Sequence, residues 1–298
     1  MIWIILALGV ALFKSLWELA GKIFTDTKKD NAIDEYSLVF WARFFSFIIL
    51  LPIIFFIDIP DISLSFFVIL SISSLLWAIA NITAIKAVKH GELSIVWPLT
   101  ALTIPFLIFT TYIINNETLN LYGYIWVLAI FIGTYFLWVS KMQKWFFAPI
   151  VSIYENTGAK YMVFTTILWS ITAPLDKLWI ENTGVLWWMF LTNLCITFFI
   201  ASYMICIKKN FSLEKITNKK SIKKSLSITV LGWVWIFLQM LAYTYTLVIY
   251  VIAIKRASWI FSVLFWYIFY KEKNITIKLI AAAIMLAWVA IISIFGNI

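Results

Sequence analysis

The sequence has few charged residues for its length. Asp, Glu, Lys and Arg make up 12% of its 298 residues, whereas 64% are hydrophobic and the mean hydropathy is +0.99. Soluble domains carry charge on about 25% of their residues. The length alone would suit two soluble domains, but this composition excludes them and favours a chain that is embedded in lipid.

The residue types that usually carry catalysis or bind metals are also scarce. The chain has one histidine, His90, and two cysteines, Cys195 and Cys206. The cysteines lie on one apolar run and are too far apart for a disulfide if that run is helical. Without a paired acidic motif or a Walker loop, we expect no metal site, no histidine-based proton relay and no direct use of ATP. The sequence therefore predicts neither an enzyme nor a cofactor.

What the sequence does contain is a series of long apolar runs. About 20 apolar residues cross a bilayer as a helix. We therefore predict an all-α integral membrane protein with ten transmembrane helices. The first run has no basic segment before it and no small-residue cleavage site after it, so it is interpreted as a retained helix rather than a signal peptide. The predicted spans are 2–23, 36–57, 66–86, 94–114, 119–140, 160–179, 185–207, 225–246, 249–270 and 275–295.

The basic residues are distributed unequally between the loops. Of the 23 lysines and arginines, 18 follow spans 1, 3, 5, 7 and 9, and seven of these lie in the loop 208–224. The opposite loops contain Asp58, Asp61, Glu117 and Glu181. By the positive-inside rule, the lysine-rich side is cytoplasmic and both termini are extracytoplasmic. The net charge of +9 thus indicates contact with the cytoplasmic membrane and its lipids rather than with nucleic acid.

Short motifs recur in the two halves of the chain. Glu272 follows Glu117 by 155 residues, and Lys177 follows Lys22 by the same 155 residues. Because each half has an odd number of spans, the halves would have opposite orientations, and inverted repeats of this kind place a substrate site near the midplane. The predicted parts are a first five-helix repeat at 1–140, a cytoplasmic linker at 141–159 and a second, inverted five-helix repeat at 160–298.

This layout resembles the EamA type of the drug/metabolite transporter (DMT) superfamily. The resemblance is carried by Glu117 and Glu272 after spans 4 and 9, by Pro98 and Pro105 in span 4, and by the block AIKRASWIFSVLFWYIFYKE with the following IKLIAAAIMLAWVAIISI. It covers both halves and implies a ten-span transporter that works by alternating access of its two repeats.

Lys255 and Arg256 stand side by side within span 9. Cations at that depth are costly and usually face a cavity or a partner, although long side chains can also snorkel to the headgroups. The pair is similar to one in the related triose-phosphate and nucleotide-sugar translocators, where it holds the substrate phosphate. We interpret it as substrate-binding.

The other polar residues within the spans are candidates for binding, coupling or packing. Lys14 and Glu18 lie one turn apart and would neutralise each other, or Glu18 would be a proton-coupling carboxylate, which is similar to the small multidrug resistance branch of the superfamily. Lys14 and Arg43 are further candidates for binding the substrate, although Arg43 could instead snorkel to the cytoplasmic face. Asp176 and Lys177 are expected at the outer interface. Asn81, Asn193 and Gln239 would join helices, and the candidate aromatic lining is Trp17, Trp97 and Tyr243, unless these rings serve packing.

Cations outnumber carboxylates among these deep residues, which favours an anionic ligand. The predicted function is secondary transport of a small polar, anionic or zwitterionic metabolite. The alternative is a translocase (flippase) for a lipid or lipid-linked sugar with an anionic headgroup. The expected partners are the small-molecule substrate and membrane lipids. A homodimer is a further alternative.

Overall fold

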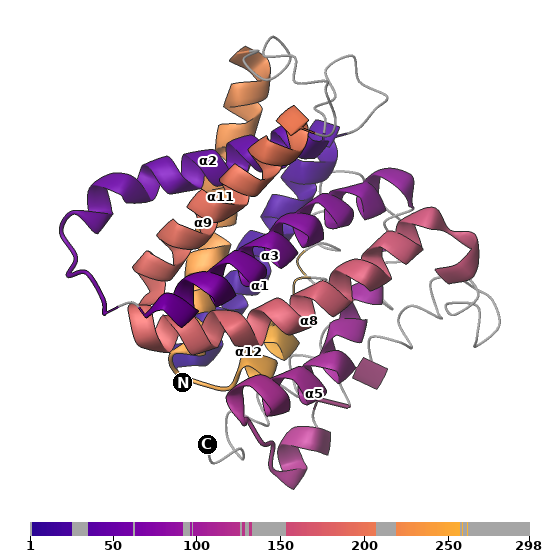
Figure 1. The fold of residues 1–298 in the computed structure, drawn as a ribbon. Coiled ribbons are helices and arrows are strands. Elements are labelled where there is room, and N and C mark those ends of the chain that lie inside the picture. The colour runs from indigo at the N-terminus through magenta and orange to yellow at the C-terminus, as the bar shows by residue number, and fades with distance from the viewer. Residues whose placement is uncertain are drawn as a thin grey trace.

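The computed structural model describes residues 2–25, 35–61, 63–91, 96, 98–125, 127–128, 131–132, 153–206, 219–256, 258 and 261. Within these ranges the chain is a bundle of helices without strands (Figure 1). The helices are α1 (Ile2–Thr25), α2 (Glu35–Ile54), α3 (Leu64–His90), the 3-10 helix η1 (Pro98–Leu102), α5 (Thr103–Asn115), α8 (Thr157–Thr183), α9 (Val185–Cys206), α11 (Lys219–Tyr243) and α12 (Val248–Lys255).

The helices follow the predicted spans where both can be compared. Among the described residues, five helices are long and apolar enough to cross a membrane, and the shorter apolar stretch Leu99–Asn115 joins them. Predicted span 10, half of span 5 and most of the second half of span 9 lie outside the described residues. For the described residues, the prediction of an all-helical chain with several membrane-length helices is thus confirmed.

Span 4 differs from the prediction of one continuous helix over 94–114. Val96 is α-helical, but the 3-10 helix η1 follows at Pro98–Leu102, and α5 starts at Thr103. Pro105 sits in the first turn of α5, where a missing N–H group costs nothing. At the other end, Asn116 adopts a left-handed conformation with φ 54°, and the N–H of Glu117 bonds to the carbonyl of Thr111 at 3.2 Å. This cap ends α5 and turns Glu117 away from the helix axis.

The bundle is built from helix pairs that are distant in sequence. α1 packs along α11, α3 along α8, and α2 against α9. The short helix α12 lies among α1, α5, α8 and α11 (Figure 1). Its residues from Val248 to Ile254 belong to the main hydrophobic core. The last residues of α12 are therefore held in the middle of the bundle.

The close packing of α3 on α8 depends on a glycine pair. A Cβ atom added to Gly158 would lie 2.5 Å from the Cα of Gly91 and 2.6 Å from the carbonyl oxygen of Ala87. Further along the same interface, the hydroxyl groups of Thr83 and Thr165 are hydrogen-bonded at 2.7 Å. Small residues and hydroxyl bonds of this kind are typical of helix contacts in membranes.

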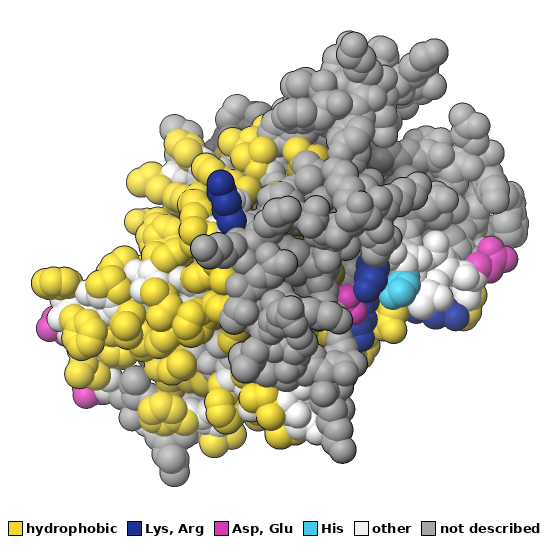
Figure 2. Space-filling view, turned by 90° about the horizontal axis from the view of Figure 1, so that it is seen from above, with side chains coloured by type: hydrophobic (Ala, Val, Ile, Leu, Met, Phe, Trp, Pro, Cys, Tyr) yellow, Lys and Arg dark blue, Asp and Glu magenta, His cyan; other side chains and the backbone are white. Residues whose placement is uncertain are grey.

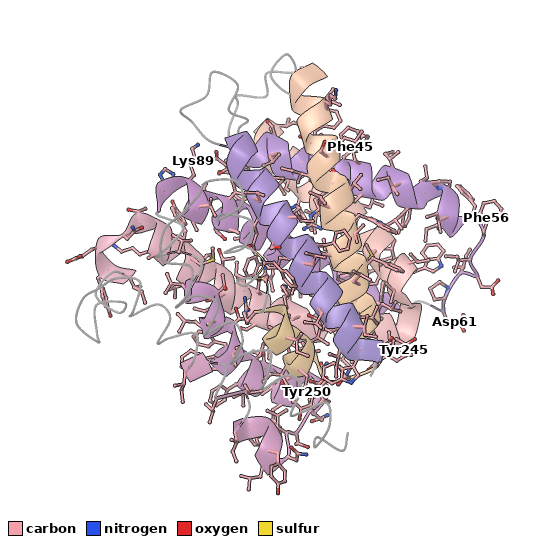
Figure 3. All side chains as sticks on the ribbon, turned by 180° about the vertical axis from the view of Figure 1, so that it is seen from behind. Phe45, Phe56, Asp61, Lys89, Tyr245 and Tyr250 are labelled. Atoms are coloured by element: carbon pink, nitrogen blue, oxygen red, sulfur yellow. The ribbon has the colours of Figure 1, made fainter. Side chains whose placement is uncertain are left out.

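The surface of the described residues is largely apolar. On the face shown in Figure 2, most described side chains are hydrophobic, and the charged ones gather in a few places. Large apolar side chains, such as Phe56 with 90% exposure and Phe109 with 66%, point outwards. Such a surface fits acyl chains rather than water. In Figure 3, Lys89 and Asp61, which come from loops predicted on opposite sides of the membrane, lie at opposite ends of the bundle.

Candidate functional site

Among the described residues, six charged side chains lie in the middle of the bundle, apart from the ion pairs of Glu35 with Lys89 and of Glu117 with Lys177. They come from α1, α2, α8, and the C-terminal end of α12, and each is less than a tenth exposed. They are Lys14, Glu18, Arg43, Asp176, Lys255 and Arg256. Charges at this depth are costly unless they interact with one another or with a ligand.

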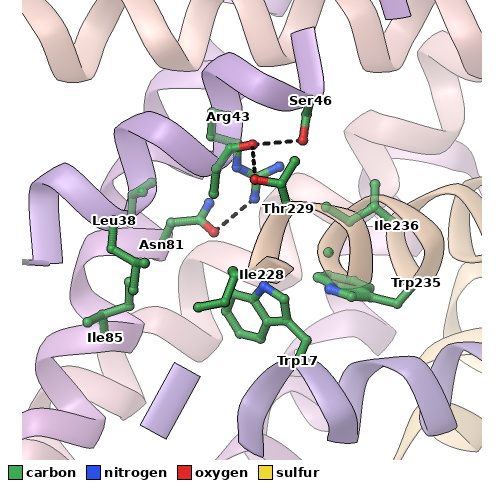
Figure 4. A pocket seen from close by; sticks show the side chains of 13 residues that line it. Trp17, Leu38, Arg43, Ser46, Asn81, Ile85, Ile228, Thr229, Trp235 and Ile236 are labelled. Carbon is green, nitrogen blue, oxygen red and sulfur yellow. Dashed lines mark hydrogen bonds between the residues drawn. The ribbon is translucent and has the colours of Figure 1, made fainter. Parts of the chain in front are cut away.

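Arg43 faces a pocket enclosed by α1, α2, α3 and α11 (Figure 4). Trp17 and Trp235 form one wall, with ring centroids 6.3 Å apart. Thr229 and Asn81 add polar groups to the lining, and the remaining lining residues are mostly aliphatic. The structure therefore brings two of the predicted site residues, Arg43 and Trp17, into one pocket.

Two asparagines hold the guanidinium group of Arg43. It donates to the Oδ1 atom of Asn81 at 2.9 Å and to that of Asn193 at 3.3 Å. Each asparagine donates its own amide N–H to the carbonyl four residues earlier in its helix, to Trp77 at 2.6 Å and to Met189 at 2.7 Å. These bonds fix the oxygen of each amide towards Arg43. Because both acceptors are neutral, Arg43 is positioned without being neutralised by them.

Lys255 lies against the ring of Trp235, which also lines the Arg43 pocket. Its Nζ atom is 4.8 Å from the ring centroid and donates to the Oε1 atom of Gln239 at 2.7 Å. Gln239 in turn donates to the hydroxyl of Tyr243 at 2.8 Å. Lys14 approaches the same Trp235 ring at 5.9 Å. Trp235 thus contacts both the Arg43 pocket and a second group of cations.

Lys14 and Glu18 form an ion pair within α1, which confirms the pairing interpretation of their spacing. Glu18 also interacts electrostatically with Arg256, whose side chain is 4% exposed. The Nε atom of Arg256 has no hydrogen-bond partner among the described residues. Glu18 therefore has two basic neighbours, one on its own helix and one at the end of α12.

Asp176 corrects a sequence-based expectation. The sequence predicts it at the outer interface, but it is completely buried in the bundle and is a second deep carboxylate besides Glu18. The indole N–H of Trp77 lies 3.1 Å from both of its carboxylate oxygens. α8 continues to Thr183, beyond the predicted end of the span at 179, so Asp176 lies almost two turns before the helix end.

Lys177, the neighbour of Asp176, takes part in a separate contact near the start of α12. It donates to Glu117 at 2.8 Å and to the carbonyl of Thr246 at 3.0 Å. Glu117 also accepts the N–H of Val248, the first residue of α12, at 3.2 Å. We call Glu117, Lys177 and this helix start the α12 anchor. It ties together α5, α8 and α12, and it was missed because the partners are far apart in sequence.

Two predicted site residues remain, Tyr243 and Trp97. Tyr243 is fully buried beside Gln239, next to the Lys255 group. Trp97 lies outside the described residues. Within the described ranges, no three His, Cys, Asp or Glu side chains come together as a metal site.

Residues 1–139 match the family model "EamA-like transporter family". This matched part of the chain, 139 of its 298 residues, is EamA-like. The match confirms the resemblance that the sequence indicates. EamA proteins are multi-pass membrane transporters and not enzymes.

The comparison of structures extends over the second half as well. A solved structure described only as "Crystal structure of protein" covers 95% of this chain and 95% of its own chain, with a TM-score of 0.66 and 12% sequence identity. This similarity concerns the fold of the whole EamA-like chain. No curated protein matches the sequence.

Proposed function

We propose that this EamA-like protein is a secondary transporter for a small polar metabolite that is anionic or zwitterionic. The observation that carries the proposal is the excess of buried cations. Four basic side chains, Lys14, Arg43, Lys255 and Arg256, accompany two carboxylates, Glu18 and Asp176, in the middle of the described bundle. Two further buried carboxylates, Glu35 and Glu117, have their own basic partners, Lys89 and Lys177. Two positive charges are left without an acidic partner among the described residues if all six groups are ionised. An anion would compensate for them.

The pocket suits the recognition of such a ligand. Arg43 lines it with a planar fork of donors, which matches a carboxylate, phosphate or sulfonate group. The aromatic wall of Trp17 and Trp235 would contact the apolar part of the same molecule. Ligand and site would therefore share one charged and one apolar contact.

The helix packing supports the proposal that the chain consists of two inverted repeats. If α1, α2 and α3 correspond to α8, α9 and α11, the contact of α1 with α11 corresponds to that of α8 with α3. The contact of α2 with α11 likewise corresponds to that of α9 with α3. Both members of each pair are present in the structure, and α2 also packs on its own counterpart α9. This arrangement has the form of a two-fold relation, as alternating access by rocking repeats requires.

We further propose that the protein lies in the cytoplasmic membrane with the lysine-rich loops in the cytoplasm and both termini outside. The proposal rests on the loop charges. The separation of Lys89 from Asp61 along the bundle is compatible with it (Figure 3).

A thermal-shift screen of the purified protein tests the proposed substrate class. Carboxylates, phosphate esters, sulfonates and zwitterionic amino acids are compared with matched cations and neutral sugars. A ligand that binds the folded state raises the unfolding temperature. We expect stabilisation by anions or zwitterions, followed by uptake of the same compound into proteoliposomes.

Two variants make the screen specific. Arg43→Lys keeps the charge but loses the fork, so the stabilising compound should bind about ten- to a hundredfold more weakly. Lys223→Gln removes a charge from the exposed start of α11 and serves as the control. Stabilisation by cations alone would refute the proposed substrate class. Stabilisation by anionic lipids alone, together with copurified lipid, would favour the translocase instead.

A further inference from the structure

We propose that Asp176 is the carboxylate that couples a proton to anion binding in the Arg43 pocket. The inference rests on the proposed transport of an anion and adds the residue that takes the proton. The sequence suggests Glu18 for this role. The structure shows the surroundings of both carboxylates, and these differ.

The surroundings of Asp176 make its charge dependent on other helices. It is fully buried on α8, and its hydrogen-bond donor, the Trp77 indole on α3, is neutral. The cations that act on it are Lys255 on α12 and Arg43 on α2. A buried carboxyl group stays ionised only while neighbouring positive charge replaces its lost hydration.

The other titratable groups around Asp176 do not alter this balance. Tyr243 of α11 interacts with it electrostatically and is neutral when protonated. On α8 itself, Lys177 is engaged by Glu117. α5 and α9 have no Asp, Glu, Lys, Arg or His residue, and α3 carries its charged residues in its last turns, from Lys86 onwards.

The pocket and the carboxylate are joined through Trp77. The guanidinium group of Arg43 lies 5.6 Å from the centroid of the Trp77 ring, while the N–H of that ring bonds to Asp176. Asn81, which holds Arg43, also bonds to the backbone carbonyl of Trp77. An anion that binds Arg43 is therefore separated from Asp176 by a single side chain, that of Trp77.

An anion in the pocket would neutralise Arg43 and so remove part of the positive charge that stabilises the Asp176 carboxylate. The carboxylate then takes up one proton from water and becomes a neutral carboxyl group. The anion brings a negative charge and the proton removes one, so the net charge of the bundle stays the same for a monovalent anion. Binding of the anion thus favours binding of the proton, and binding of the proton favours that of the anion to the same degree.

Glu18 is less suited to this role. Its first partner, Lys14, is on the same helix at i−4 and stays with it when helices move. The cations that act on Asp176 belong to α2 and α12, whose distance from α8 can change between conformations. Trp77 connects Asp176 to Arg43 itself, whereas Glu18 reaches only the Trp235 wall of the pocket, through Lys14.

The first experiment observes the proton directly in the ligand-free protein. Infrared difference spectra are recorded during a pH titration of the wild type, Asp176→Asn and Glu18→Gln. The control is Glu181→Gln, which removes an exposed carboxylate from α8, the helix that carries Asp176. Asn keeps an oxygen for the Trp77 N–H, so the fold should persist. We expect a carboxylic-acid C=O band on acidification that Asp176→Asn alone lacks. A band that persists in Asp176→Asn overturns the proposal.

The second experiment adds sulfate, whose charge is constant over the range of the titration. In the wild type, sulfate should make the acid band appear at a proton concentration lower by about 5- to 150-fold. Sulfate affinity should rise on acidification in the wild type and in Glu181→Gln and be independent of pH in Asp176→Asn. If Glu18→Gln rather than Asp176→Asn removes the pH dependence, or if sulfate leaves the band unmoved, Asp176 is not the coupling residue. The anion screen described above decides separately whether the transport proposal holds.

Discussion

The α12 anchor allows one prediction to be worked out in detail. Glu117→Gln removes the charge that pairs with Lys177, while the new side chain can still accept the N–H of Val248. Lys177 keeps the Thr246 carbonyl at 3.0 Å and the carboxylate of Glu181 at 3.9 Å. The Lys177 and Glu117 side chains are only 12% and 6% exposed, so solvent screens their interaction little.

The expected cost follows from this geometry. Breaking a buried ion pair by removing one partner costs about 3–5 kcal/mol. Because Glu181 and a carbonyl remain near Lys177, we expect a value near the lower end, about 3 kcal/mol. Lys177→Met should cost less, about 1.5–3 kcal/mol, since the Glu117 carboxylate keeps the N–H of Val248 and the favourable start of α12.

The double variant Glu117→Gln/Lys177→Met completes the cycle. It removes both charges, so it should be less destabilised than the sum of the single variants by about 2 kcal/mol. The free energies of unfolding are measured by denaturant titration in mixed micelles. Glu181→Gln, whose carboxylate is 56% exposed, is the control and should change stability by at most about 0.5 kcal/mol. Strictly additive effects of the two single variants would refute the ion-pair argument.

Three other predictions concern topology, the cation pair and packing. A reporter fused after Ile298 should be extracytoplasmic, and a cytoplasmic signal would reverse the proposed orientation. Arg256→Lys should weaken binding of the screened anion by about ten- to a hundredfold in a direct titration, and Lys255→Ala by a smaller factor; unchanged affinity in both would mean that the pair only snorkels. Gly158→Ala should lower the unfolding temperature because its Cβ would collide with Gly91, whereas Gly21→Ala, with open space around it, should leave it almost unchanged.

The positions of the helices were predictable because lipid imposes a simple requirement. A helix must be long and apolar enough to satisfy its own backbone in the bilayer, and hydropathy along the sequence records that directly. α9 follows its predicted span of 185–207 to within one residue at its end. The break before α5 was harder to predict, because Pro98 and Pro105 permit a helix start at several positions.

The candidate site was predictable only in part. Lys14, Arg43, Lys255 and Arg256 could be found because a cation in an apolar run is conspicuous. Their partners could not be found in this way. Nothing in the sequence says that Asn193 reaches Arg43 across 150 residues, since helical periodicity identifies faces of one helix but not which helix they meet.

Asp176 shows why a charge near the end of a span is difficult to place from sequence. Its depth depends on where α8 ends, and the charged residues Lys177 and Glu181 made the last turns look interfacial. In the structure Lys177 is instead paired with Glu117, so α8 can continue to Thr183 and keep Asp176 inside the bundle. The ion pair between Lys177 and the distant Glu117 is thus part of what keeps the neighbouring Asp176 buried.

The same pairing links the α12 anchor to the binding site. Glu117 binds the first N–H of α12 at Val248, and Lys255 is the last residue of this helix. Seven residues of helix correspond to about 10 Å, so the contact at Val248 sets how deep Lys255 reaches into a core of about 30 Å. Lys255 acts on Asp176 and lies against Trp235, the wall of the Arg43 pocket. A change at Glu117 should therefore alter ligand binding as well as stability, although Glu117 itself does not line the pocket.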